Sequence, residues 1–203
     1  MRGRSVPLRE RKIDVAILAF FLVNILFITY VVDIEQLIIS NPYHFSYPLW
    51  PLAPAVDAIH WWGSTFDPLL MARPVWWKMT IWIDVLGFGP FYVVAIYAFA
   101  TGRNWIRLPS SIYSAMLCTI VVIILGEELA GAHATPHFPI VFLANLPWLL
   151  FPLIIIARMW RSPSPFTRAT VLSPTTTTPA PPAAPAAPAP ASTVLAPGDT
   201  ASG

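Results

Sequence analysis

Four apolar stretches, each long enough to cross a lipid bilayer, dominate this sequence. They are Ile13–Val32, Trp76–Ala100, Pro109–Leu125 and Phe138–Ala157. A membrane-spanning helix needs about 17–25 mostly apolar residues, and each of these stretches meets that requirement. We therefore predict an all-α fold, an integral membrane four-helix bundle.

The composition supports a membrane protein and excludes several soluble classes. Of the 203 residues, 56% are hydrophobic and only 11% are charged, whereas soluble domains carry about 25% charged residues. The single cysteine excludes a disulfide within the chain and a cysteine metal cluster. The four histidines lack metalloprotease spacing, and no glycine-rich nucleotide loop occurs. We expect no metal, no cofactor and no nucleic-acid partner.

The basic residues gather at one end of the predicted helices. Acidic rather than small residues follow the first apolar stretch, so we expect a span there and not a cleaved signal peptide. The positive-inside rule places the helix ends that carry the basic residues, and with them both termini, in the cytoplasm. We expect the endoplasmic reticulum membrane in a eukaryote and the plasma membrane in a bacterium. Ten of the twelve basic residues lie on this side: Arg2, Arg4, Arg9, Arg11, Lys12, Arg103, Arg107, Arg158, Arg161 and Arg168.

Two segments are expected outside the bundle. The loop from Asp33 to Val75 is too long for a hairpin, and we predict a non-cytoplasmic cap with a short helix over Ala55–Phe66. Trp61 and Trp62 in that helix are interpreted as interfacial anchors. From Ser162 the chain is rich in Pro, Ala and Thr, so we predict a disordered C-terminal tail. The predicted domains are residues 1–161 and 162–203.

Asp84 and Asn145 are predicted to lie at similar depths in the bilayer. They stand eight and seven residues into helices that enter from the same face, which corresponds to about 12 and 10 Å. A charged group at the bilayer centre costs at least about 2.5–3.5 kcal/mol, so an acid there indicates function. Either the two side chains share a cavity with Trp148, or they bond each other or a free carbonyl and serve only helix packing. Asp14 is expected to reach the interface from the first helical turn, and Asn24 to serve packing.

Motifs spread over all four predicted helices resemble one membrane-protein family. They are Asp33 in DIEQ, Asp67 in DPLL, Pro74-x-Trp76, Asp84, Pro90-Phe91, Trp105-Ile-Arg107-x-Pro109, Ile112-Tyr113-Ser114 and Asn145-Leu-Pro-Trp148. This set resembles the EXPERA family, which holds the emopamil-binding sterol isomerase and the sigma-2 receptor. The likeness covers roughly residues 13–160.

The resemblance implies a pocket, open to the bilayer, for sterol-like or amine-bearing ligands. One position departs from the sterol isomerase, which carries a histidine one turn before its first acid, where Ile28 stands here. The roles that the resemblance implies are catalytic and ligand-binding acids at Asp33 and Asp84, further ligand-binding residues at Asn145, Trp148 and Tyr113, and a structural acid in the cap at Asp67.

Two functions from different classes follow. The first is a membrane isomerase that shifts a carbon–carbon double bond in a sterol or terpenoid. An apolar pocket favours a neutral carboxyl that can protonate an alkene, which suits Asp84, and Asp33 and Trp148 would stabilise the resulting cation. The second is a non-catalytic sterol, lipid or cationic-amine binder, which the likeness to the sigma-2 receptor suggests. Either function has membrane lipids and a sterol- or terpenoid-like molecule as partners, and a homodimer stays open.

Overall fold

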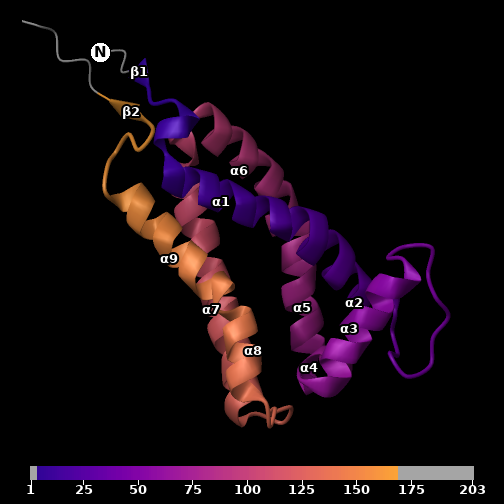
Figure 1. Ribbon diagram of the computed structural model, residues 1–203. Coiled ribbons are helices and arrows are strands. Elements are labelled where there is room, and N and C mark those ends of the chain that lie inside the picture. Colours follow the sequence, from indigo (N-terminus) through magenta and orange to yellow (C-terminus); the bar gives the residue numbers. More distant parts are fainter. Residues whose placement is uncertain (1–3, 169–203) are drawn as a thin grey trace, which may run out of the picture. The chain divides into compact units, whose positions relative to one another are not determined.

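A computed structural model describes residues 4–168 of the chain (Figure 1). The predicted disorder of residues 169–203 lies outside the described residues. η1 and η4 are 3₁₀ helices, and η2 and η3 are π-helical. In chain order the elements are β1 (Arg4–Ser5), η1 (Leu8–Glu10), α1 (Lys12–Val23), η2 (Asn24–Asp33), α2 (Ile34–Ile38), α3 (Ala53–Thr65), α4 (Pro68–Ala72), α5 (Val75–Ile83), η3 (Asp84–Phe88), α6 (Gly89–Thr101), η4 (Asn104–Ile106), α7 (Arg107–Ala130), α8 (Phe138–Asn145), α9 (Pro147–Trp160) and β2 (Thr167–Arg168).

Four helical stretches among the described residues are long and apolar enough to cross a membrane. The predicted all-α fold with four membrane helices is therefore confirmed. The first stretch continues past its predicted end at Val32, because Glu35 and Gln36 find polar partners within the protein. The four stretches are Lys12–Ile38, Val75–Thr101, Asn104–Ala130 and Phe138–Trp160.

An aromatic core joins the spans at the end away from the cap. α7 packs along α9, and α1 packs against α6. Phe21 of α1 is fully buried, and its ring centroid lies 5.6 Å from that of Phe99. Phe91 stacks on Tyr113 at 4.6 Å. Such aromatic pairs are worth about 0.5–1.5 kcal/mol each beyond their buried area, so this part of the bundle is held firmly.

Irregular turns shape the second and fourth spans. Pro90 has no N–H group, and the turn before it is π-helical, with the Gly89 N–H donating to the Asp84 carbonyl. Gly89 also permits a close approach of the first span, since a Cβ atom there would lie 3.2 Å from Cγ2 of Thr29. In the fourth span, α8 ends at Asn145 and Pro147 begins α9. Asp84 and Asn145 thus stand at helix irregularities.

The cap consists of α3 and α4. The predicted helix over Ala55–Phe66 is confirmed, since α3 runs from Ala53 to Thr65. Asp67 caps α4 by accepting the Leu70 N–H at 3.0 Å. Arg73 ends α4 with a left-handed φ of 49°, and its Nη2 lies 2.9 Å from both carboxylate oxygens of Glu35. This buried ion pair ties the cap to the end of the first span.

The other end of the bundle differs from the sequence expectations. The prediction for Asp14 is wrong: it is fully buried and forms ion pairs with Arg11 at 2.9 Å and Arg158 at 3.1 Å. Two cationic partners compensate the cost of burying the carboxylate. Residues 162–168, which the predicted boundary places in the tail, pack on the bundle. Phe166 is fully buried and β2 pairs antiparallel with β1.

Candidate ligand-binding site between the cap and the spans

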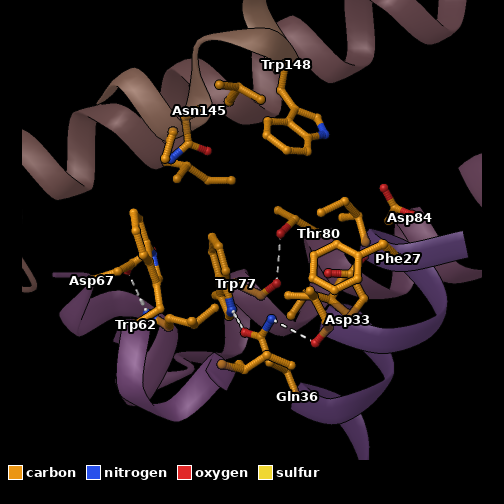
Figure 2. Close-up of a pocket in the computed structure, with 18 of the residues that line it drawn as sticks. Phe27, Asp33, Gln36, Trp62, Asp67, Trp77, Thr80, Asp84, Asn145 and Trp148 are labelled. Atoms are coloured by element: carbon orange, nitrogen blue, oxygen red, sulfur yellow. Dashed lines mark hydrogen bonds between the residues drawn. The ribbon is translucent and has the colours of Figure 1, made fainter. Parts of the chain in front are cut away.

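A cavity of about 470 Å³ lies between the cap and the four spans. Its volume falls in the range of about 300–1,000 Å³ that is typical of small-molecule sites. Figure 2 shows side chains from several elements converging on it. Most of the lining is apolar or aromatic, including Phe27, Ile59, Trp61, Trp62, Trp77 and Leu117.

The cavity brings together most of the residues singled out in the sequence. Asp33, Asp67, Asp84, Asn145 and Trp148 all line it, although they come from four separate parts of the chain, namely the cap and the first, second and fourth spans. Asp84 and Asn145 share the cavity without bonding each other in the hydrogen-bond network of the described residues. The packing alternative in its first form, a direct bond between the two, therefore does not describe their arrangement. Its second form, a bond to a backbone carbonyl, describes Asn145, which donates to the Val141 carbonyl.

Tyr113 takes a different place from the one that the family resemblance implies. It is buried in the aromatic core and is not among the described residues that line the cavity. Its hydroxyl donates to the Tyr92 hydroxyl at 3.4 Å, and Tyr92 donates to Oδ2 of Asp84 at 3.3 Å. Tyr113 is thus linked to the cavity through one intervening side chain.

The two acids of the first and second spans share one electrostatic environment. Asp33 is buried, and its side chain lines the same cavity as that of Asp84. Thr29, one turn before Asp33, donates a hydrogen bond of 2.5 Å to Oδ1 of Asp84. Two uncompensated carboxylates in an apolar cavity are costly. Either a cation must therefore bind beside them, or one of them must take up a proton. The arrangement is therefore suited to a cationic ligand or to proton transfer.

The fourth span supplies an aromatic wall. The Trp148 indole N–H donates to Oδ1 of Asn24 at 2.8 Å, and Nδ2 of Asn24 donates to the Phe20 carbonyl at 2.7 Å. The predicted packing role of Asn24 is confirmed by these bonds and by its complete burial. Asn145 donates to the Val141 carbonyl of its own helix at 2.9 Å. Figure 2 shows Asn145 and Trp148 facing Trp77 and Thr80 across the cavity.

Several lining residues escaped the sequence reasoning. Gln36 accepts the Trp77 indole N–H at 2.6 Å, and Thr80 donates to the Trp77 carbonyl at 2.8 Å. Helical spacing could have found two of them, since Gln36 follows Asp33 by three residues and Thr80 precedes Asp84 by four. Trp61 and Trp62, interpreted as interfacial anchors, also line the cavity.

Comparison with known proteins identifies the family of this chain. The model of the family described as EXPERA (EXPanded EBP superfamily) matches residues 54–159, more than half of the sequence. The chain belongs to the EXPERA family. It is similar to the sigma intracellular receptor 2 of Xenopus tropicalis, with 33% identity over 119 residues that cover 53% of this chain and 70% of the relative. The human sigma intracellular receptor 2 is 32% identical over 121 residues, which cover 53% of this chain and 69% of the relative.

The family assignment agrees with the motif resemblance and with the four apolar helices. This EXPERA protein is an integral membrane protein. The matched residues begin within α3 of the cap and end within α9, so they include Asp67, Asp84, Asn145 and Trp148. Asp33 precedes the matched segment and joins the site through the fold.

Proposed function

We propose that this EXPERA protein binds a sterol- or terpenoid-like molecule, or a lipophilic amine, in the cavity between the cap and the spans. The observation that carries the proposal is the pair of acids, Asp33 and Asp84, in one largely apolar cavity of about 470 Å³. The apolar body of such a ligand would contact the aromatic walls, and its cationic or polar end would meet the acids. Membrane lipids surround the protein and are the source from which an apolar ligand enters.

Each cavity residue has a role in this proposal. Asp33 and Asp84 hold the polar or cationic end of the ligand. Trp148 supplies an aromatic face, which attracts cations through the ring quadrupole. Asn145 adds hydrogen-bonding capacity at the fourth span. Asp67 keeps the structural role of capping α4, although its side chain also borders the cavity.

A binding role without catalysis is the function that the cavity supports best. Ile28 lines the cavity at the position where the resemblance leads us to expect a histidine in a sterol isomerase. An isoleucine can neither donate nor accept a proton. The similarity to sigma intracellular receptor 2 proteins also favours a receptor-type or carrier-type binder.

Double-bond isomerisation is a second candidate, favoured by the two carboxyls that line one cavity, since one can donate a proton while the other accepts one. In this reaction the Asp84 carboxyl donates its proton to one alkene carbon, which leaves a carbocation on the neighbouring carbon. The Asp33 carboxylate then removes a proton from the next carbon, and the new double bond forms there. The substrate is isomerised, and one proton has moved from Asp84 to Asp33. Proton exchange between the two acids through water restores the starting state.

Binding of a lipophilic amine to the purified wild type, Asp33→Asn and Asp84→Asn tests the proposed cavity. If Asp84 faces the ligand cation, its replacement should cost about 2–5 kcal/mol of binding free energy. If it serves packing alone, the cost should be about 1 kcal/mol, so the two interpretations differ at least about fivefold in affinity. Thermal denaturation provides the folding control. Unchanged affinity in both folded variants would refute the proposal.

A second measurement separates the binder from the isomerase. Purified wild-type protein in lipid vesicles is incubated with a sterol that carries a movable double bond, and its isomers are quantified. Amine binding that depends on Asp84, without sterol conversion, supports the binder. Conversion by the wild type that is lost in Asp84→Asn supports the isomerase.

We further propose that both termini lie on the cytoplasmic side, in the endoplasmic reticulum of a eukaryote or the plasma membrane of a bacterium. Basic residues at the ends of the spans away from the cap support this orientation, whereas the cap end carries Arg73 and Lys78.

A further inference from the structure

A second groove, of about 570 Å³, lies at the end of the bundle away from the cap. It is located where the first span begins and the fourth span ends, and the segment after α9 closes one side. Neither the family assignment nor the proposed cavity accounts for it. Its charged lining consists of Arg9, Glu10, Arg11, Lys12, Asp14 and Arg158.

The groove carries a surplus of positive charge. Four of the six charged side chains are basic and two are acidic, which leaves a formal surplus of two positive charges. At its base, the carboxylate of Asp14 is shared by the guanidinium groups of Arg11 and Arg158. Two cations thus share one anion in a place where their side chains are only 4% and 19% exposed. A further anion would be attracted strongly here, because water screens buried charges poorly.

The two arginines are held rigidly. Nη1 of Arg11 donates to the Phe99 carbonyl at 2.9 Å, and Nη2 of Arg158 donates to the Pro165 carbonyl at 2.7 Å. The Phe166 ring lies under both guanidinium groups, at 5.0 Å from Arg11 and 5.4 Å from Arg158. Little side-chain entropy would therefore be lost when an anion binds, which favours affinity.

We propose that this groove binds the phosphate of an anionic phospholipid headgroup. Its position favours a lipid over free phosphate, because Lys12 begins one membrane span and Trp160 ends another. Exposed Arg9 and Lys12 stand at the rim, and Ser164 and Thr167 add hydroxyl groups to the lining. Ile13 also lines the groove and is 48% exposed, so it offers an apolar surface to an acyl chain.

The headgroup would join the first span to the fourth through ionic contacts. Basic pockets between membrane helices are a recurrent way to recognise anionic lipids. Each basic residue near an anionic membrane surface raises the binding affinity about fivefold. Removal of two rim residues should then weaken lipid binding roughly twentyfold or more.

The test uses the full-length protein in detergent micelles, with phosphatidylglycerol, phosphatidylcholine and inorganic phosphate as probes. Bound lipid is counted by native mass spectrometry, and affinity is measured by titration. We expect the wild type to prefer phosphatidylglycerol over phosphatidylcholine at least about tenfold. The double variant Arg9→Gln/Lys12→Gln should lose this preference without loss of amine binding in the cavity, since neither residue lines it.

A matched control removes the same charge elsewhere at this end of the bundle. Arg103 and Arg161 are exposed basic residues that do not line the groove, and Arg103→Gln/Arg161→Gln should keep most of the lipid preference. Equal losses in both double variants would overturn the proposal in favour of unspecific attraction. Saturation of the groove by inorganic phosphate as readily as by phosphatidylglycerol would overturn the lipid assignment.

Discussion

Thr29 of the first span donates a hydrogen bond of 2.5 Å to Oδ1 of Asp84 in the second span. The contact lies beside Gly89, where a Cβ atom would come within 3.2 Å of Cγ2 of Thr29. A hydroxyl that donates to a carboxyl favours its charged form. Under the proposed function, this hydrogen bond would help Asp84 to receive a cationic ligand.

Replacement of Thr29 by valine should weaken the binding of a lipophilic amine. Valine has nearly the same shape as threonine but cannot donate to Asp84. The expected loss is about 1–2 kcal/mol, or about fivefold to thirtyfold in affinity. Thr80→Val is the matched control, because Thr80 lines the same cavity but donates to the Trp77 carbonyl of its own helix. An equal loss of affinity in the two variants would contradict the assigned role.

The ion pair between Arg73 and Glu35 should be a main source of cap stability. Both side chains are buried, and Arg73 also donates to the Ile39 carbonyl at 2.7 Å. Arg73→Gln removes the cation that contacts both oxygens of the buried Glu35 carboxylate and leaves only the contact of 2.8 Å with Nε2 of His60. The expected cost is about 3–5 kcal/mol of unfolding free energy. Thermal and denaturant unfolding in detergent measure the loss. The double variant Arg73→Gln/Glu35→Gln should recover part of it, and no recovery would argue against the pair as the cause.

Truncation separates the packed segment after α9 from the rest of the tail. We propose that residues 169–203 are dispensable for folding and ligand binding, because their composition cannot form a core. A chain ending at Arg168 should accumulate in membranes and bind amine as the full chain does. A chain ending at Ser162 lacks the fully buried Phe166 and should be less stable by about 3–5 kcal/mol, as for other large buried aromatic residues. Equal stability of the two truncated proteins would contradict this expectation.

The orientation of the chain is tested by cysteine labelling. In a Cys118→Ala background, cysteine is placed at Gly203 or at Ser46, an exposed residue of the loop between α2 and α3. A membrane-impermeant thiol reagent added from the cytoplasmic side should label the terminal cysteine alone. Labelling of Ser46→Cys from that side, with Gly203→Cys protected, would reverse the topology.

The sequence by itself predicted the four spans, the cap helix and the membrane class. Apolar run length is a local property, since a helix in lipid satisfies its own backbone groups whatever its neighbours are. Asp84 could be recognised as unusual for the same reason, because the cost of a charge in the bilayer depends on its position along one helix. The family motifs then indicated which acids belong to the site, namely Asp33 and Asp84, and which acid is structural, namely Asp67.

Only the tertiary structure decided which side chains meet. Each π-helical turn contains an extra residue, which rotates the following side chains by about 100° around the helix axis. Hydropathy does not reveal this rotation. It therefore could not predict the contacts that depend on the rotation, namely that of Thr29 with Asp84 and that of Tyr113 with Tyr92. The burial of Asp14 likewise depends on Arg158, which lies 144 residues later in the chain. Contacts of such separation follow from the packing of whole helices, and no local pattern of residues encodes them.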